Sequence, residues 1–376
     1  MKKVKLKVYV AMSGGVDSSV AATLLHKQGY GVTGIFFKPW QPKQGSGNCM
    51  WQQDRQDAMR VCAKLGIPFK TWDFSREYGR RVAKYMIDGY RTGITPNPDV
   101  MCNKEIKFGL FLKKALAEGA DYIATGHYAR IARVKSYQVP KVRKVKLDKL
   151  DGLYKLLTGV DKNKDQSYFL WTLTQEQLKH CLFPIGDYTK PEVRKLAKKF
   201  GLANHAKKDS QGVCFVGQLN MKEFLTSYIK PKTGDIVLAE TGKKIGQHDG
   251  AYYYTIGQRH GLDIKDGGGP YFVARKDIRK NIIYVTGAQQ ITNYKLQVIK
   301  IERVSWVGNV PKLPLNCQVK IRYGSESISA TISRLNLEMG VVSVKFKKPA
   351  RAVTPGQSAV FYKGEEVLGG GIITSY

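Results

Sequence analysis

Residues 5–29 read KLKVYVAMSGGVDSSVAATLLHKQG, and this stretch decides the fold of the N-terminal part of the chain. Its apolar run at 5–12 predicts a short buried strand, and a helix is predicted from about 17 to 28, ending at Gly29. Paired glycines between the two let the backbone approach an anion closely. Successive N–H groups and the start of a helix add positive potential. The stretch therefore predicts a phosphate-binding loop over residues 13–18.

Predicted strands and helices alternate beyond this loop. The strands are expected at 31–38, 67–74 and 121–124, and the helices at 54–65, 76–91, 104–118 and 190–200. Such alternation predicts a parallel sheet with helices on both faces. We therefore expect an α/β, Rossmann-like domain over residues 1–220, interrupted by a basic stretch at 131–150 that forms a hairpin or a mobile loop.

The pattern changes after about residue 220. A Gly-rich region with β-like pieces at 235–239 and 252–256 predicts a small central domain over 221–292. Almost no helix is predicted over 293–376, where short strands are expected at 297–305, 317–323, 327–333, 341–346, 358–362 and 366–373. Short strands at this spacing are typical of a small antiparallel β-barrel.

The chain is strongly basic, because 62 Lys and Arg against 30 Asp and Glu leave a formal charge of +32. Such a balance favours a polyanionic partner, whose condensed counterions are released on binding; a general lysine bias of the proteome is the alternative. No apolar run approaches the roughly 20 residues needed to span a bilayer. The N-terminus lacks the features of a signal peptide. We expect a cytoplasmic protein without membrane contact.

The six cysteines contain no C-x-x-C pair, which argues against a zinc site. Cys102 follows Asn97-Pro98-Asp99 and precedes the helix predicted at 104, where a helix dipole lowers the pKa of a thiol. Asp99 is close enough in sequence to move protons there. Cys214 follows two lysines and a glycine, which also favour a thiolate. Cys62, Cys181 and Cys317 are interpreted as buried apolar residues.

Ser13 and Ser18 are expected to donate hydrogen bonds to phosphate, and Asp17 to hold Mg²⁺. The chain has no G-x-x-x-x-G-K-[ST] and no G-x-G-x-x-G, which disfavours a Walker ATPase and a dinucleotide dehydrogenase. A plain tight turn with Asp17 as helix cap is the structural alternative. The motif S-G-G-x-D-S resembles the loop of the PP-loop ATP pyrophosphatases, which cleave ATP between its α and β phosphates. With two reactive cysteines, an adenylating loop suggests sulfur transfer.

Further motifs resemble one family of this superfamily, the tRNA-specific 2-thiouridylases. They are N-P-D-x-x-C-N-K-E-I-K-F (97–108), A-T-G-H-Y (124–128), K-D-Q-S-Y-F-L (164–170), K-K-D-S-x-G-x-C-F (207–215), T-I-G-Q-R (255–259) and T-P-G-Q-S-A-V (354–360). The resemblance covers essentially the whole chain. It implies an adenine-nucleotide α-hydrolase-like domain, a small central domain and a C-terminal β-barrel that binds tRNA.

The resemblance also implies roles for particular residues. Those at the ATP site would be Ala11, Met12, Ser13, Gly14, Gly15, Val16, Asp17, Ser18, Phe37 and Gly126. The target base would lie against Asn97, Pro98 and Asp99, with Cys102 as nucleophile, Cys214 as persulfide carrier and Asp99 as proton carrier. Contacts to tRNA would come from His127, Lys164, Asp165, Gln166, Arg322, Tyr323 and Gln357.

The implied reaction is 2-thiolation of the wobble uridine U34 in the anticodon loop, with ATP and Mg²⁺ as cofactors and no metal site of the protein's own. A cysteine desulfurase or a sulfur-relay protein would supply the sulfur, and the enzyme is expected to be a monomer. Another tRNA-modifying adenylase, of the lysidine synthetase or 4-thiouridine synthetase type, is the main alternative. A small-molecule ligase would not need such a basic chain. A non-catalytic RNA-binding module is the alternative from another class of protein. It would bind tRNA equally well after substitution of Ser13, Asp17 or Cys102, so these substitutions distinguish it from an enzyme.

Overall fold

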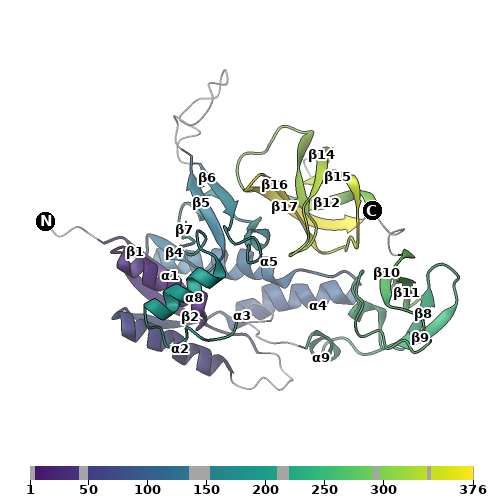
Figure 1. Cartoon of the computed structure of the whole chain (residues 1–376), viewed down its shortest axis with the longest axis horizontal. Coiled ribbons are helices and arrows are strands. Elements are labelled where there is room, and N and C mark those ends of the chain that lie inside the picture. The colour runs from purple at the N-terminus through teal and green to yellow at the C-terminus, as the bar shows by residue number, and fades with distance from the viewer. Residues whose placement is uncertain are drawn as a thin grey trace.

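The computed structural model describes residues 5–41, 50–134, 153–209, 220–290, 296–336 and 340–375. Three sheets organise these residues. Figure 1 shows the first sheet and its helices on the left, a barrel at the upper right, and a small sheet at the lower right. Within the described residues, no helix is long and apolar enough to cross a membrane.

The first sheet has five parallel strands in the order β3-β2-β1-β4-β7. Its strands are β1 (Lys7–Met12), β2 (Gly31–Lys38), β3 (Phe69–Asp73), β4 (Tyr122–Ala124) and β7 (Cys181–Leu182). One face packs on the helices α1 (Val16–Lys27), α2 (Met50–Leu65) and α8 (Lys190–Lys199) through Val8 and Val10. Tyr9 and Ile35 lie in a second core with the helices of the opposite face. The predicted α/β fold with helices on both faces is confirmed.

Two long helical stretches cover that second face. The first contains α3 (Ser75–Tyr78), the π-helical η1 (Gly79–Ala83) and α4 (Lys84–Arg91); the second contains α5 (Pro98–Cys102), the π-helical η2 (Asn103–Phe111) and α6 (Leu112–Ala117). The second was predicted to begin at 104, which is wrong by six residues. Asn97 caps it by accepting the Val100 N–H at 3.2 Å, and Pro98 suits the first helical position because it needs no N–H partner. This start signal was present in the sequence.

The C-terminal part forms the predicted antiparallel barrel. Its six strands are β12 (Leu296–Trp306), β13 (Leu315–Lys320), β14 (Ile328–Asn336), β15 (Val341–Ala350), β16 (Ser358–Lys363) and β17 (Glu366–Ser375). Pairing of β12 with β17 closes these six strands into a barrel, so that each of them has a neighbour on both sides. Alternate inward residues such as Val319, Ile332 and Phe361 form its core.

The middle part carries the four-stranded sheet β10-β11-β8-β9. Its elements are α9 (Met221–Thr226), β8 (Gly234–Leu238), β9 (Lys244–His248), η6 (Ala251–Tyr253), β10 (Tyr271–Asp277) and β11 (Ile282–Gly287). The β-like piece predicted at 252–256 was wrong, since Ala251–Tyr253 is a 3-10 turn. Aromatic residues raise strand propensity, but here the ring of Tyr253 is buried and its hydroxyl donates to the Ile229 carbonyl.

A hairpin joins the first domain to the barrel. Strands β5 (Ala129–Arg133) and β6 (Tyr154–Thr158) pair with each other, and β6 also pairs with β17 of the barrel. Ion pairs Arg130–Glu365 and Lys155–Glu366, both 2.7 Å, support this extension. The basic stretch predicted at 131–150 thus begins within one strand, β5, and is followed by another, β6. Its residues from 135 onward lie outside the described residues. The remaining described elements are η5 (Ser167–Leu170) and α7 (Gln175–Leu178).

A second junction brings the barrel against the loop that precedes α5. The Thr95 N–H donates to the Pro355 carbonyl, and the Gln357 side-chain amide donates to the Thr95 carbonyl, each at 2.9 Å. Gly356, at φ +92°, has no room for a side chain, since a Cβ there would lie 2.8 Å from the Thr95 carbonyl oxygen. The barrel therefore helps to hold the backbone from which Asn97, Pro98 and Asp99 follow.

We expect Gly356→Ala to weaken this junction. Crowding against Thr95 should cost about 1–3 kcal/mol beyond the strain of a left-handed alanine. The matched control is Gly364→Ala, at φ +57° with open space around it, which should cost only the strain of about 1–2 kcal/mol. Thermal unfolding of both variants measures the difference. Equal melting temperatures would show that the junction does not constrain the barrel.

Candidate active site

The loop after β1 has the geometry of an anion cradle. Gly14 adopts φ +76°, and a Cβ on it would lie 2.2 Å from the Asp54 carbonyl oxygen, so only glycine fits. The Ser13 and Ser18 hydroxyl oxygens lie 3.2 Å apart, and Gly15 N–H donates to Ser13 Oγ at 3.3 Å. Gly15 precedes α1, so the first N–H groups of that helix point toward the loop.

The turn after β4 packs directly on this loop. A Cβ on Gly126 would lie 2.7 Å from the Ser18 nitrogen, which explains glycine at this position. Two residues on, the Tyr128 hydroxyl donates to Asp17 Oδ1 at 2.9 Å. Burial, and then the charge of Asp17, raise the pKa of Tyr128, so its hydroxyl stays protonated.

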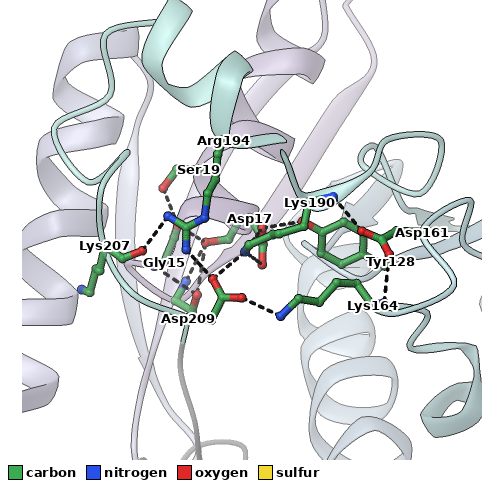
Figure 2. A network of polar contacts seen from close by, with 12 residues as sticks. Gly15, Asp17, Ser19, Tyr128, Asp161, Lys164, Lys190, Arg194, Lys207 and Asp209 are labelled. Atoms are coloured by element: carbon green, nitrogen blue, oxygen red, sulfur yellow. Dashed lines mark hydrogen bonds and ion pairs between the residues drawn. The ribbon is translucent and has the colours of Figure 1, made fainter. Parts of the chain in front are cut away.

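Asp17 lies at one end of a network of charges, shown in Figure 2. Lys190, the first residue of α8, donates to both carboxylate oxygens of Asp17 at 2.7 and 2.8 Å, and lies 2.9 Å from Asp209 Oδ1. Lys164 and Arg194 each bind Asp209 at 2.7 Å. Burial alone would raise the pKa of Asp209, but the hydrogen bonds from Lys164 and Lys190 outweigh it and lower that pKa to about 2. Asp209 is therefore ionised at neutral pH.

The loop backbone is held by Asn204. The buried side-chain amide of Asn204 donates to the Gly14 carbonyl and to Ser19 Oγ, both at 2.9 Å. With its carbonyl fixed in this direction, the Gly14–Gly15 peptide presents its N–H group toward the Ser13 side of the loop. Sequence reasoning assigned no role to Asn204, Lys190, Tyr128 or Asp209. Tyr128 and Asp209 stood within recognised motifs, whereas no sequence signal marks Asn204 or Lys190.

The segment 164–170 connects this network with the helix of Cys102. The Gln166 N–H donates to the Tyr128 carbonyl at 2.9 Å, and Gln166 Oε1 accepts from the Tyr128 N–H at 3.1 Å. At the other end, the Asn103 amide donates to the Phe169 carbonyl at 3.2 Å. Asp165 is buried and accepts from Gly159 N–H and from the N–H and hydroxyl of Ser167. Segment 164–170 therefore joins the turn that carries Tyr128 to the helix that carries Cys102.

Cys102 is the fifth residue of α5 and is 0% exposed. A helix dipole stabilises a thiolate only within the first turn of the helix, and Cys102 lies beyond that turn. The helix start therefore does not stabilise the Cys102 thiolate in the way predicted from the sequence. Asp99 lies in that first turn, and Asn97 is the buried cap residue. Cys214, the predicted persulfide carrier, lies outside the described residues.

Phe37 and His127 belong to the protein core. The Phe37 ring makes edge contacts with Phe74 and Phe111 at centroid distances of 5.4 and 4.9 Å, so its contact with adenine stays a prediction. His127 is 7% exposed and lies 2.7 Å from Thr125 Oγ1 through its Nδ1. Burial, and then the charge of Lys107, lower the pKa of His127 well below its usual value, so the ring is neutral.

The barrel residues predicted to touch tRNA differ in exposure. Arg322 donates to the Ile256 carbonyl and to Thr354 Oγ1 at 3.2 and 2.9 Å, which joins the barrel to the central domain. Tyr323 is 40% exposed and stands beside the Phe169 ring at 4.5 Å between centroids. Tyr323 therefore offers an accessible aromatic face, while Arg322 and Gln357 hold domain junctions.

The three cysteines interpreted as apolar residues are buried as predicted. Burial raises the pKa of Cys62 and of Cys317 to about 12, and it raises the pKa of Cys181 as well. All three remain neutral thiols at physiological pH. In the part of the chain that the structure describes, no group of three or more His, Cys, Asp or Glu side chains is arranged to hold a metal ion.

We expect Asn204→Ala to weaken nucleotide binding about tenfold, because the Gly14 carbonyl loses its buried donor and the loop relaxes. Isothermal titration with α,β-methylene-ATP and Mg²⁺ measures this affinity. The control is Asn220→Ala, which removes the cap of α9 and should cost stability without affecting nucleotide affinity. Unchanged affinity in Asn204→Ala would show that Asn204 does not orient the loop.

Comparison with known proteins covers the whole chain. Family models described as the tRNA methyl transferase HUP domain, the tRNA methyl transferase PRC-barrel domain and the aminomethyltransferase β-barrel domain match residues 6–218, 222–287 and 296–373. A solved complex of a 4-thiouridine synthetase with RNA and bound ATP shows only a weak likeness, with 18% identity, a TM-score of 0.33, and coverage of 56% of this chain and 45% of that chain.

Two full-length relatives have names that state an activity. The chain is 48% identical over 370 residues to tRNA-specific 2-thiouridylase MnmA 2 of Geobacillus kaustophilus, and 49% identical over 374 residues to tRNA-specific 2-thiouridylase MnmA of Bacillus licheniformis. Each alignment covers 98% of this chain and 94% of the relative. The protein with this phosphate loop and this buried cysteine helix therefore belongs to the tRNA-specific 2-thiouridylase family.

Proposed function

We propose that the protein catalyses the ATP-dependent replacement of the C2 oxygen of U34 in tRNA by sulfur from a persulfide on Cys214. The observation that carries the proposal is the link made by segment 164–170. This segment binds Tyr128 of the phosphate-loop network at one end and Asn103, next to Cys102, at the other. Asp209, from which the Cys214 segment follows in the sequence, is held in the same network by Lys164 and Lys190.

The loop fits a nucleotide with Mg²⁺. The glycine cradle, the two serine hydroxyls and the start of α1 provide donors for phosphate oxygens. Asp17 offers one carboxylate at this place, and Mg²⁺ typically takes one or two carboxylates together with substrate phosphates and water. When bound, the ion would neutralise charge on the phosphates. The residues present thus suit a magnesium site completed by the nucleotide.

The first chemical step activates the base. U34 must leave the anticodon stack to reach the pocket, at a cost of a few kcal/mol. Its O2 attacks the α-phosphorus, the bond from that phosphorus to the bridging oxygen breaks, and pyrophosphate leaves. The loop N–H groups stabilise the phosphate charge as it develops. Asn97, Pro98 and Asp99 would hold the base, and Asp99 would accept its N3 proton.

The second step transfers sulfur. The terminal sulfur of the Cys214 persulfide attacks C2, the C2–O bond breaks, and AMP leaves. The Cys102 thiolate then attacks Cys214 Sγ, which breaks the S–S bond, forms a Cys102–Cys214 disulfide and releases 2-thiouridine. The two cysteines supply the two electrons that reduce the sulfane sulfur. An external dithiol must reduce the disulfide before the next turnover.

Several partners follow from this chemistry. The sulfur donor would be a cysteine desulfurase or a sulfur-relay protein, and the enzyme would act as a monomer in the cytoplasm. The basic surface would bind tRNA through its phosphates. Tyr323 with Phe169 would stack on an unpaired base. Six residues would hold the tRNA-facing surface in place: Lys164, Asp165, Gln166, His127, Arg322 and Gln357.

A thiolation assay tests the proposal. Unmodified tRNA, ATP with Mg²⁺ and a labelled sulfur source are expected to yield wobble 2-thiouridine and pyrophosphate. Both Cys102→Ser and Cys214→Ser should lose thiolation, because each removes one sulfur needed for transfer. Cys317→Ser in the barrel core is the control and should keep thiolation. ATP cleavage without thiouridine, or thiolation indifferent to both cysteines, would favour another tRNA-modifying adenylase.

We expect Tyr323→Ala to weaken tRNA binding by about 5- to 150-fold, since an aromatic stack contributes roughly 1–3 kcal/mol per base. Filter binding of anticodon stem-loop RNA measures the affinity. Leu335→Ala, which removes an exposed apolar side chain from the same barrel, is the control and should bind normally. Normal binding by both variants would remove Tyr323 from the RNA surface.

A further inference from the structure

Lys190 stands out among the lysines that the structure describes, because it alone lies in the protein interior, with 8% of its surface exposed. Its ammonium contacts the two Asp17 oxygens and Asp209 Oδ1, all within 2.9 Å. The position of the ammonium over the Tyr128 ring, 5.9 Å from its centroid, adds a further contact. A buried cation therefore lies directly beside the phosphate loop.

We propose that Lys190 is a ligand of the nucleotide phosphates, bound to Asp17 in the conformation described here and transferred to phosphate oxygens when the nucleotide binds. The inference rests on the proposed ATP-dependent function. Lys190 lies outside the sequence motifs that the chain shares with its family. Its assignment adds a phosphate-binding side chain to a loop that otherwise contributes N–H groups and hydroxyls.

Charge balance supports this exchange. A nucleoside triphosphate brings several negative charges next to the Asp17 carboxylate, so binding requires compensating cations. Asp17 is the carboxylate that we assign to the Mg²⁺ accompanying the nucleotide, and this ion would compete with the Lys190 ammonium, which binds both oxygens of Asp17. Moving Lys190 to the phosphates frees Asp17 and neutralises phosphate charge in the same event. A lysine on a flexible stem suits this role.

The surrounding structure permits the side chain to move without the backbone. The Lys190 N–H donates to Asp161 Oδ2 at 2.8 Å, and a capping box of Thr189 and Glu192 fixes the start of α8. Asp209 keeps Lys164 and Arg194 after Lys190 departs, so its charge stays paired. Figure 2 shows Lys190 between the carboxylates of Asp17 and Asp209, with Lys164 and Arg194 also reaching Asp209.

Binding of the non-cleavable analogue α,β-methylene-ATP with Mg²⁺, measured by titration calorimetry without tRNA, tests the proposal. Lys190→Met should bind about 10- to 100-fold more weakly than wild type, because a charge-assisted contact is lost. Lys198→Met, which removes an exposed cation from the last turn of the same helix α8, should bind within about twofold of wild type. Wild-type affinity in Lys190→Met would overturn the inference.

An acyl-phosphate derivative of ATP gives a second measurement on the unmodified protein. Its acyl group passes to a lysine amine beside the terminal phosphate, with ATP as the leaving group, and mass spectrometry identifies the lysine. Acylation of Lys190, suppressed by excess ATP, is expected. Labelling confined to other lysines would overturn the inference, and this result holds even if Lys190→Met fails to fold. If wild type binds no nucleotide at all, the proposed function fails first and this inference with it.

Discussion

The carboxylate of Asp17 is the point on which the site depends. It accepts hydrogen bonds from Lys190 and Tyr128, which come from two elements far from the loop in the chain. The Lys190 ammonium is buried, and a buried charge is costly unless it is paired, so the ion pair with Asp17 holds these elements together. Through them, α8 and the turn after β4 are fixed against the start of α1. The phosphate loop is thus held by two elements that lie far from it in the sequence.

The same network reaches the helix that carries Cys102. Lys190 and Lys164 bind Asp209, and the segment of Lys164 continues to the carbonyl that Asn103 binds, next to Cys102. The barrel enters from the other direction, through the contact of Gln357 with Thr95. One connected set of hydrogen bonds therefore joins the phosphate loop to the helix of Cys102. Several residues that were predicted to touch RNA also form these hydrogen bonds. Their presence in the motifs therefore has a structural reason.

Much of the fold could be predicted because its signals are local. The strand 31–38 was predicted at its observed bounds, and the phosphate loop was located from its glycines. The helix start at Pro98 was missed although Asn97 and Pro98 are a known cap signal, and the tyrosine-rich piece at 252–256 was predicted as strand from propensity alone. Both errors arose where a local preference competes with capping or with burial of large rings. The domain boundaries and the roles of the individual site residues remain predictions.

The sequence by itself determined the α/β fold with its C-terminal barrel, the family and the loop, since glycine spacing, strand periodicity and ordered motifs are written along the chain. Only the tertiary structure decided that Lys190 pairs with Asp17, that Asn204 holds Gly14, and that Phe37 and His127 lie in the core. The physical reason is distance along the chain. Pairing of buried charges and amides depends on which elements pack together, and a single sequence carries no local signal for partners that meet only after folding.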